Sequence, residues 1–203
     1  MYNINATIEA RLGSIRFPGK VLKKISKKTF LEFQIDRCKK SKLLSNIIVA
    51  TTNKKEDRKI INLCKKLNVK YYAGSDANVL DRITKAHIKN STDIVVRLCG
   101  DNIFQDPNMI DDTIKEFMRW KYNIVCYGGS PKVRKIPYGF DIEVLSMSLL
   151  KKTHKLCSVS DPGSFVASPI LHSHPLIRCL IINDVSEENT PACCSVSESI
   201  EWA

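Results

Sequence analysis

The stretch EARLGSIRFPGKVL, residues 9–22, decides how the start of this chain folds and where its chemistry is expected. It directly follows residues 6–8, a short apolar run typical of a strand. It then places the cations Arg11, Arg16 and Lys20 around two glycines and a proline. A flexible, basic loop at the end of a strand is a common way of holding phosphate groups.

The loop matches neither of two well-known phosphate-binding motifs. Five residues separate Gly13 from Gly19, and Lys20 is followed by Val21, so it is not a Walker A sequence. It also lacks the Gly-x-Gly-x-x-Gly spacing of dinucleotide-binding folds. Its physics is nevertheless similar, because glycines let backbone N–H groups approach phosphates and arginines can clamp their oxygens. We favour phosphate binding, and the alternative is a basic surface turn.

Beyond this loop, the apolar residues of the chain follow two alternating patterns, one typical of strands and one typical of helices. Short apolar runs predict strands, and apolar residues spaced three or four apart predict helices. Such alternation indicates an α/β fold with a parallel sheet covered on both faces. Strands are predicted at residues 46–51, 69–72, 93–98, 122–127 and 140–145, helices at 56–67, 78–89, 106–121 and 146–156, and a late apolar run at 176–182.

Parallel sheets bind ligands at the carboxyl ends of their strands, which here means the opening loop, Thr51-Thr52 and Gly100-Asp101. Asp101 directly follows a buried strand, where a carboxylate could bind Mg²⁺ or merely cap a turn. Asp106 precedes a proline and is better explained as a helix cap.

The amino-acid composition excludes several classes of function for this chain. The chain has 203 residues, 43% of them hydrophobic, and a formal net charge of +11. That charge fits an anionic partner, but dispersed cations and an aromatic content of 7% argue against nucleic acid. The eight cysteines form no Cys-x-x-Cys pair, so they predict neither zinc nor a redox motif. We expect no membrane span and no signal peptide, and therefore a cytoplasmic protein.

Five segments in order resemble the sugar-activating cytidylyltransferases, which include the acylneuraminate and 3-deoxy-manno-octulosonate cytidylyltransferases. The resemblance is strongest to the branch called spore coat polysaccharide biosynthesis protein F. It runs from about residue 6 to residue 157. The segments are ARLGSIRFPGKVL (10–22), IIVATT (47–52), GSDANVLDRITKA (74–86), DIVVRLCGDNIFQDPNMID (93–111) and IPYGFDIEVLSMSLLKK (136–152).

This resemblance implies a fold, a reaction and a site. The fold would be a Rossmann-like α/β/α sandwich of the nucleotide-diphospho-sugar transferase type, with a mostly parallel central sheet. The reaction would be transfer of CMP from CTP to a sugar or sugar acid, with release of pyrophosphate and with Mg²⁺ as cofactor, and the family allows a homodimer. Arg11, Lys20 and Asp101 would be catalytic, Asp101 as the metal ligand. The CTP-binding residues would be Ala10, Arg11, Leu12, Gly13, Ser14, Arg16, Lys20, Thr51, Asp81 and Arg82.

Four further residues could either bind a ligand or play an ordinary structural role. Asp81 and Arg82 match a family segment near the nucleotide, but they would also suit the first turn of an ordinary helix. Asp141 and Glu143 could contact the sugar, or could face solvent from a strand.

The sequence also departs from the family. Glu9 stands where Pro or Gln is usual, and a carboxylate there should be turned away or paired, for example with Arg11. Asn189 stands where a second metal-binding Asp is usual. We therefore expect a single domain over residues 1–203, with a divergent or truncated part from about residue 158. Two functions follow: an active cytidylyltransferase, or a catalytically weak homologue that binds nucleotide or a protein partner.

Overall fold

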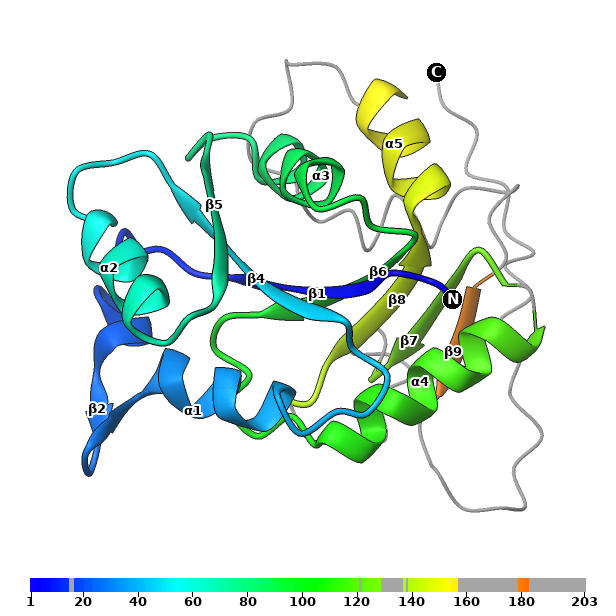
Figure 1. Cartoon of the computed structure of the whole chain (residues 1–203), viewed down its shortest axis with the longest axis horizontal. Coiled ribbons are helices and arrows are strands. Elements are labelled where there is room, and N and C mark those ends of the chain that lie inside the picture. The colour runs from blue at the N-terminus through cyan, green and yellow to red at the C-terminus, as the bar shows by residue number, and fades with distance from the viewer. Residues whose placement is uncertain (15–16, 121, 129–136, 138, 157–178, 183–203) are drawn as a thin grey trace.

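A computed structural model of the chain describes residues 1–14, 17–120, 122–128, 137, 139–156 and 179–182. Its centre is a seven-stranded sheet in the order β5-β4-β1-β6-β8-β7-β9 (Figure 1). The predicted strands are confirmed, with ends that shift by at most three residues. The strands are β1 (Ile4–Glu9), β4 (Asn46–Thr52), β5 (Lys70–Gly74), β6 (Ile94–Cys99), β7 (Ile124–Tyr127), β8 (Ile142–Ser146) and β9 (Cys179–Ile182).

The sheet is mostly parallel, as the sequence predicts. β1 pairs in parallel with both β4 and β6, β4 with β5, and β7 with β9. The exception is β8, which runs antiparallel to both β6 and β7. An antiparallel neighbour, unlike a parallel one, needs no crossover helix.

Helices cover both faces of the sheet (Figure 1). α1, α2 and α4 lie on one face, and α3 and α5 lie on the other, which makes the predicted α/β/α sandwich. The first helix was not predicted from hydrophobic spacing; a reciprocal capping box between Thr29 and Glu32 starts it. The helices are α1 (Phe30–Cys38), α2 (Arg58–Lys66), α3 (Val79–Lys89), α4 (Pro107–Trp120) and α5 (Met147–Leu156).

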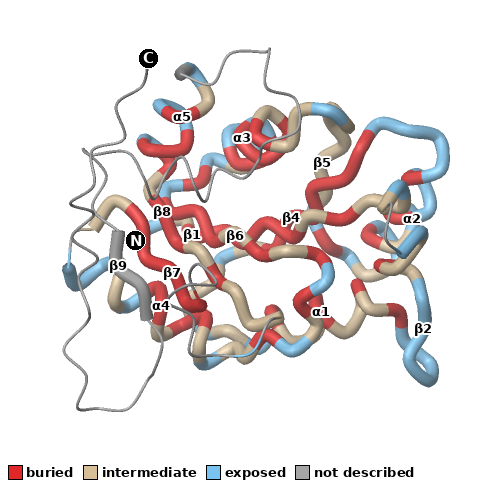
Figure 2. Tube along the Cα trace, turned by 180° about the vertical axis from the view of Figure 1, so that it is seen from behind, coloured by how far each residue is buried: buried red, intermediate tan, exposed pale blue. Residues whose placement is uncertain are grey.

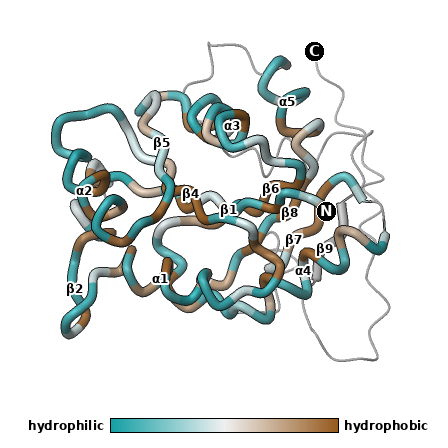
Figure 3. Tube along the Cα trace, viewed as in Figure 1, coloured by the Kyte–Doolittle hydropathy of each residue, from teal (hydrophilic) through white to brown (hydrophobic). Residues whose placement is uncertain are grey.

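The core lies in two layers on either side of the central strands. Figure 2 shows the central strands as a mostly buried band, with exposure concentrated on the outer sides of the helices and in the turns. Figure 3 shows apolar residues concentrated along the same strands. Ile8 and Val96 belong to the layer beneath α1, α2 and α4, while Ala50 and Val95 belong to the layer beneath α3 and α5. Alternation along β4, β6, β7 and β8 thus supplies apolar side chains to both layers.

A small edge structure follows the opening loop. A short 3-10 helix, η1 (Lys20–Leu22), leads into a two-stranded hairpin of β2 (Lys24–Ile25) and β3 (Lys28–Thr29). The hairpin connects the loop to α1, so both ends of the loop are fixed by regular structure. Within the described part of the chain, no helix is long and apolar enough to cross a membrane.

Candidate functional site

The opening loop begins where β1 ends, at the carboxyl edge of the sheet. Its shape is held by hydrogen bonds to the backbone carbonyl of Leu12. The Ala10 amide donates to the Ala50 carbonyl across a distance of 3.1 Å, which extends the contact between β1 and β4. The Leu12 carbonyl then accepts hydrogen bonds from Ser14 N at 2.8 Å and from Gly19 N at 2.9 Å. Both arms of the loop therefore converge on Leu12, and the turn between them faces solvent at Gly13.

Two of the predicted loop cations are held by carboxylates. Lys20 Nζ donates to Asp101 Oδ2, which joins the loop to the end of β6. Arg11 Nη1 lies 3.0 Å from Asp76 Oδ1, and Lys54 Nζ lies 2.6 Å from Asp76 Oδ2. Hydrogen bonds from Lys54 and Arg11 hold the pKa of Asp76 below its usual range, against the opposing effect of burial. These ion pairs gather the cations at one edge of the sheet.

The backbone at the ends of β1 and β6 is packed too closely for a side chain. A Cβ added to Gly100 would lie 1.8 Å from the Glu9 carbonyl oxygen. Only glycine fits there without moving the backbone. This contact fixes the position of Asp101, the next residue, relative to the start of the loop.

Glu9 forms a different ion pair from the one suggested by the sequence. Arg97 Nε donates to Glu9 Oε1 at 2.6 Å, and Arg97 Nη1 donates to Glu143 Oε2 at 2.6 Å. Arg11, the partner considered above, pairs with Asp76 instead. The three side chains come from the adjacent strands β1, β6 and β8 and are largely buried, with exposures of 12% for Arg97, 19% for Glu9 and 15% for Glu143.

The charges of this triad of Glu9, Arg97 and Glu143 do not cancel. Burial alone would lower the pKa of Arg97, but the charges of Glu143 and Glu9 outweigh it and raise that pKa well above its ordinary value. Two carboxylates around one guanidinium leave a formal charge of −1 in this group. Glu143, predicted either to contact sugar or to face solvent, is therefore committed to Arg97 and mostly shielded from water.

The two predicted residues on α3 have different surroundings. Asp81 Oδ1 lies 2.9 Å from Lys85 Nζ and 3.0 Å from His154 Nε2. Burial opposes these hydrogen bonds, but together they hold the pKa of Asp81 below its usual value. Asp81 therefore serves contacts within α3 and toward α5, as the helix-turn alternative suggested.

Arg82 is only 2% exposed and donates through Nη1 to the Ser75 carbonyl, while its Nε has no hydrogen-bond partner among the described residues. Burial lowers the pKa of this guanidinium. A buried arginine with spare donor capacity at the binding edge is suited to an anionic ligand.

The remaining predicted residues are less informative. Thr51 is fully buried, and its hydroxyl has no partner within the described structure. The Asp141 backbone carbonyl accepts a hydrogen bond from Gln105 Nε2 at 2.9 Å. Asp106 caps α4 as expected, accepting from the Asn108 amide at 2.7 Å. Arg16 and Asn189 lie outside the described residues.

Sequence reasoning missed four residues that organise this edge. Lys54, Asp76 and Arg97 gave no signal, because single charges in a loop or strand resemble ordinary surface residues. Asp57, whose Oδ1 accepts from the Leu12 amide at 2.8 Å, stands directly before α2, where an acid is an ordinary helix cap. Each gains its role from a partner far away in the sequence.

The described part of the site contains no activated protein nucleophile. Cys99 ends β6 close to the loop, but burial raises the pKa of its thiol to about 12. A protonated thiol is a poor nucleophile. The arrangement instead suits the binding of phosphates by cations and backbone amides.

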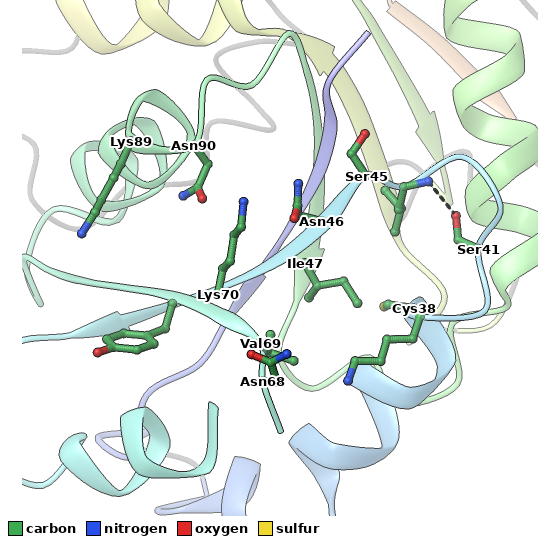
Figure 4. Close-up of a pocket in the computed structure, with 13 residues that line it drawn as sticks. Cys38, Ser41, Ser45, Asn46, Ile47, Asn68, Val69, Lys70, Lys89 and Asn90 are labelled. Atoms are coloured by element: carbon green, nitrogen blue, oxygen red, sulfur yellow. Dashed lines mark hydrogen bonds between the residues drawn. The ribbon is translucent and has the colours of Figure 1, made fainter. Parts of the chain in front are cut away.

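A separate groove of about 760 Å³ lies at the opposite edge of the sheet. Figure 4 shows Lys70, Lys89 and Asn90 among its lining residues, together with Asn46 at the start of β4. These residues lie at the amino ends of β4 and β5 and at the end of α3. Because α/β sheets bind ligands at the carboxyl ends of their strands, we place the site at the loop and not in this groove.

Comparisons with known proteins identify the family of this chain. The family model described as Cytidylyltransferase matches residues 6–155. An uncharacterized protein of Methanocaldococcus jannaschii, MJ1063, is 38% identical over 148 residues, which is 73% of this chain and 58% of that protein. The spore coat polysaccharide biosynthesis protein SpsF of Bacillus subtilis is 28% identical over 181 residues, covering 87% of this chain and 73% of its own.

The fold is also found in a solved structure. A cytidylyltransferase from Leptospira borgpetersenii matches with a TM-score of 0.82 and 26% identity, over 93% of this chain and 79% of that one. The chain spans 58% of the length of its Methanocaldococcus relative. The family match covers most of the described sheet, including the loop and the Gly100-Asp101 turn, and this chain belongs to the cytidylyltransferase family.

Proposed function

We propose that this protein transfers CMP from CTP to a hydroxyl group of a sugar or sugar acid, with release of pyrophosphate. The observation that carries the proposal is the closed loop at the carboxyl end of β1, with Arg11 and Lys20 at its two ends. Membership of the cytidylyltransferase family supports the choice of CTP as the donor. The resemblance to sugar-activating members supports a sugar as the acceptor.

In this proposal the triphosphate replaces carboxylates as the partner of the loop cations. Arg11 and Lys54 turn from Asp76 toward phosphate oxygens, and Lys20 turns from Asp101. Arginine can grip two oxygens at once, while lysine supplies a point charge. The cations stabilise the negative charge that develops on the leaving pyrophosphate as the sugar oxygen attacks the α-phosphorus in line.

Asp101 is the residue we assign to Mg²⁺. Its side chain is 45% exposed and lies beside the loop, so one carboxylate oxygen is accessible to a metal that also contacts phosphate. No cluster of three or more potential protein ligands occurs among the described residues. A single carboxylate fits Mg²⁺, which usually keeps several waters and shares its coordination with substrate phosphates. When bound, Mg²⁺ would neutralise phosphate charge and orient the α-phosphate.

Arg97 is occupied by Glu9 and Glu143, so we do not assign it to the carboxylate of a sugar acid. We expect that group to be recognised by residues other than Arg97. The name of SpsF supports a product used in surface polysaccharide synthesis.

The test is a coupled assay for pyrophosphate, run with CTP, Mg²⁺ and a panel of neutral sugars and sugar acids, and with mass spectrometry for the CMP-sugar product. The proposal expects pyrophosphate release that depends on one class of acceptor. CTP binding without turnover across a broad panel would favour the catalytically weak, nucleotide-binding alternative. Absence of both binding and turnover would refute the proposal.

A further inference from the structure

The carboxylate of Asp57 occupies a position that none of the roles above explains. Asp57 is the residue before α2 and is only 1% exposed. It stands at the N-cap position, but its side chain makes no capping hydrogen bond to the helix. A buried carboxylate without partners would be costly, so its two oxygens must be satisfied elsewhere.

Both oxygens are directed toward the carboxyl edge of the sheet, where the opening loop lies. Oδ1 accepts a hydrogen bond from the Leu12 amide at 2.8 Å, and Oδ2 accepts one from the hydroxyl of Thr52. Leu12 belongs to the opening loop and Thr52 ends β4, so one carboxylate ties the loop to the neighbouring strand. Thr52 Oγ1 in turn accepts from the Lys54 amide at 3.2 Å, which extends this link to the turn after β4.

The backbone of Leu12 also makes the hydrogen bonds that join the two ends of the loop. Its amide is held by Asp57, while its carbonyl receives the amides of Ser14 and Gly19. The Leu12 side chain packs against the hydrophobic core. Three hydrogen bonds and one apolar anchor therefore fix a single residue, Leu12, from which the exposed part of the loop projects.

We propose that Asp57 is a positioning residue for triphosphate binding: through the Leu12 amide it holds the loop in its receptive shape before nucleotide arrives. This inference rests on the proposed function, since it takes the loop to be the triphosphate site. A loop that is ordered in advance loses less conformational entropy on binding. Without Asp57, the Leu12 amide would be left unpaired and the loop would gain freedom.

The chain offers a matched control on the other side of the molecule. Asp111, on α4, is 6% exposed, and its carboxylate accepts from the Lys42 amide at 2.9 Å and from the Leu43 amide at 3.2 Å. It therefore also fastens a loop to a helix through backbone amides. That loop precedes the amino end of β4, at the opposite edge of the sheet from the candidate site.

The experiment compares Asp57→Ala, Asp57→Asn and Asp111→Ala by calorimetric titration with CTP and with CMP, in the presence of Mg²⁺. Loss of one buried hydrogen bond corresponds to roughly a tenfold change in an equilibrium constant. We expect Asp57→Ala to weaken CTP about tenfold and CMP roughly threefold or less, because CMP has fewer phosphates for the loop to hold. Asp57→Asn keeps an oxygen for the Leu12 amide and should recover most of the loss.

Asp111→Ala should lower the melting temperature and leave the dissociation constants of both nucleotides unchanged. The proposal is overturned if Asp57→Ala binds CTP as tightly as wild type, or if it loses CTP and CMP in equal proportion. If wild type itself binds no CTP, the proposed function fails first and this inference fails with it.

Hydrogen exchange on the wild-type protein provides a test that needs no variant to fold. The Leu12 amide should be strongly protected in the absence of nucleotide. Exchange at the rate of an unstructured peptide would refute the positioning role.

Discussion

The ammonium group of Lys20 donates a hydrogen bond to the carboxylate of Asp101, although 80 residues separate them in the sequence. The contact brings the proposed phosphate cation and the proposed metal ligand together at the carboxyl edge of the sheet. The two side chains are 23% and 45% exposed. A pair this accessible to water contributes little to stability, so it can be exchanged for contacts with a nucleotide.

Lys20→Ala should therefore abolish most of the stabilisation by CTP and barely change the unliganded protein. A ligand at 100 times its dissociation constant stabilises the folded state by about 2.7 kcal/mol, which a thermal melt detects readily. The control is Lys28→Ala, which breaks the exposed pair between Lys28 and Asp36 in β3 and α1. An equal CTP-induced shift in wild type and Lys20→Ala would remove this lysine from the site.

Arg97→Met should destabilise the fold strongly. The substitution leaves the carboxylates of Glu9 and Glu143 largely buried without the guanidinium between them, and breaking a buried ion pair in this way costs about 3–5 kcal/mol. The free energy of unfolding in urea measures the loss. Arg119→Met, at a surface pair with Glu116 on α4, should cost far less. Comparable losses in the two variants would mean that the triad is not the stabilising element we describe.

Gly100→Ala tests the close packing between β1 and β6. The added Cβ would lie 1.8 Å from the Glu9 carbonyl oxygen, which is backbone and cannot rotate away. We expect a loss of about 1–3 kcal/mol or more. Gly13→Ala meets no atom within 4 Å and should change stability by less than about 0.5 kcal/mol. Equal denaturant midpoints for the two variants would contradict the packing.

The buried ring of His87 should lower the free energy of unfolding in acid. Its ring is fully buried on α3 between the hydroxyls of Thr7 and Thr92. Burial lowers its pKa from 6.5 to about 3. The unfolded chain therefore takes up a proton below pH 6.5 while the folded protein does not, so this contribution is complete above pH 6.5 and declines as the pH falls.

Between pH 7 and pH 5 the decline due to His87 should be about 2 kcal/mol. The measurement is the free energy of unfolding at a series of pH values, for wild type and for His87→Gln. The variant should lack this part of the slope. Parallel curves for the two proteins would show that the ring is already accessible to protons in the folded state.

Much of the fold follows from local patterns in the sequence. The apolar runs of β4 and β6 and the spaced apolar residues of α2 and α3 were sufficient to place alternating strands and helices. α1 was missed because its start depends on a capping box, and its apolar residues give only a weak periodic signal. The reversed direction of β8 could not be predicted, since an isolated strand carries no sign of its neighbours' directions.

The candidate site was less predictable than the fold. Arg11 and Lys20 were found because the loop itself is distinctive. Their partners Asp76 and Asp101 meet them only after the strands align. Glu9 was recognised as unusual, but its partner Arg97 lies on another strand and was identified only from the structure.

Calorimetric titration of the wild-type protein with each of CTP, UTP, ATP and GTP, in the presence of Mg²⁺, tests directly whether the chain binds a cytidine nucleotide. We predict that CTP binds with a stoichiometry of one molecule per chain, and at least about tenfold more tightly than ATP. Equal binding of all four nucleotides would indicate a bare phosphate site, and no binding of CTP would contradict the account outright.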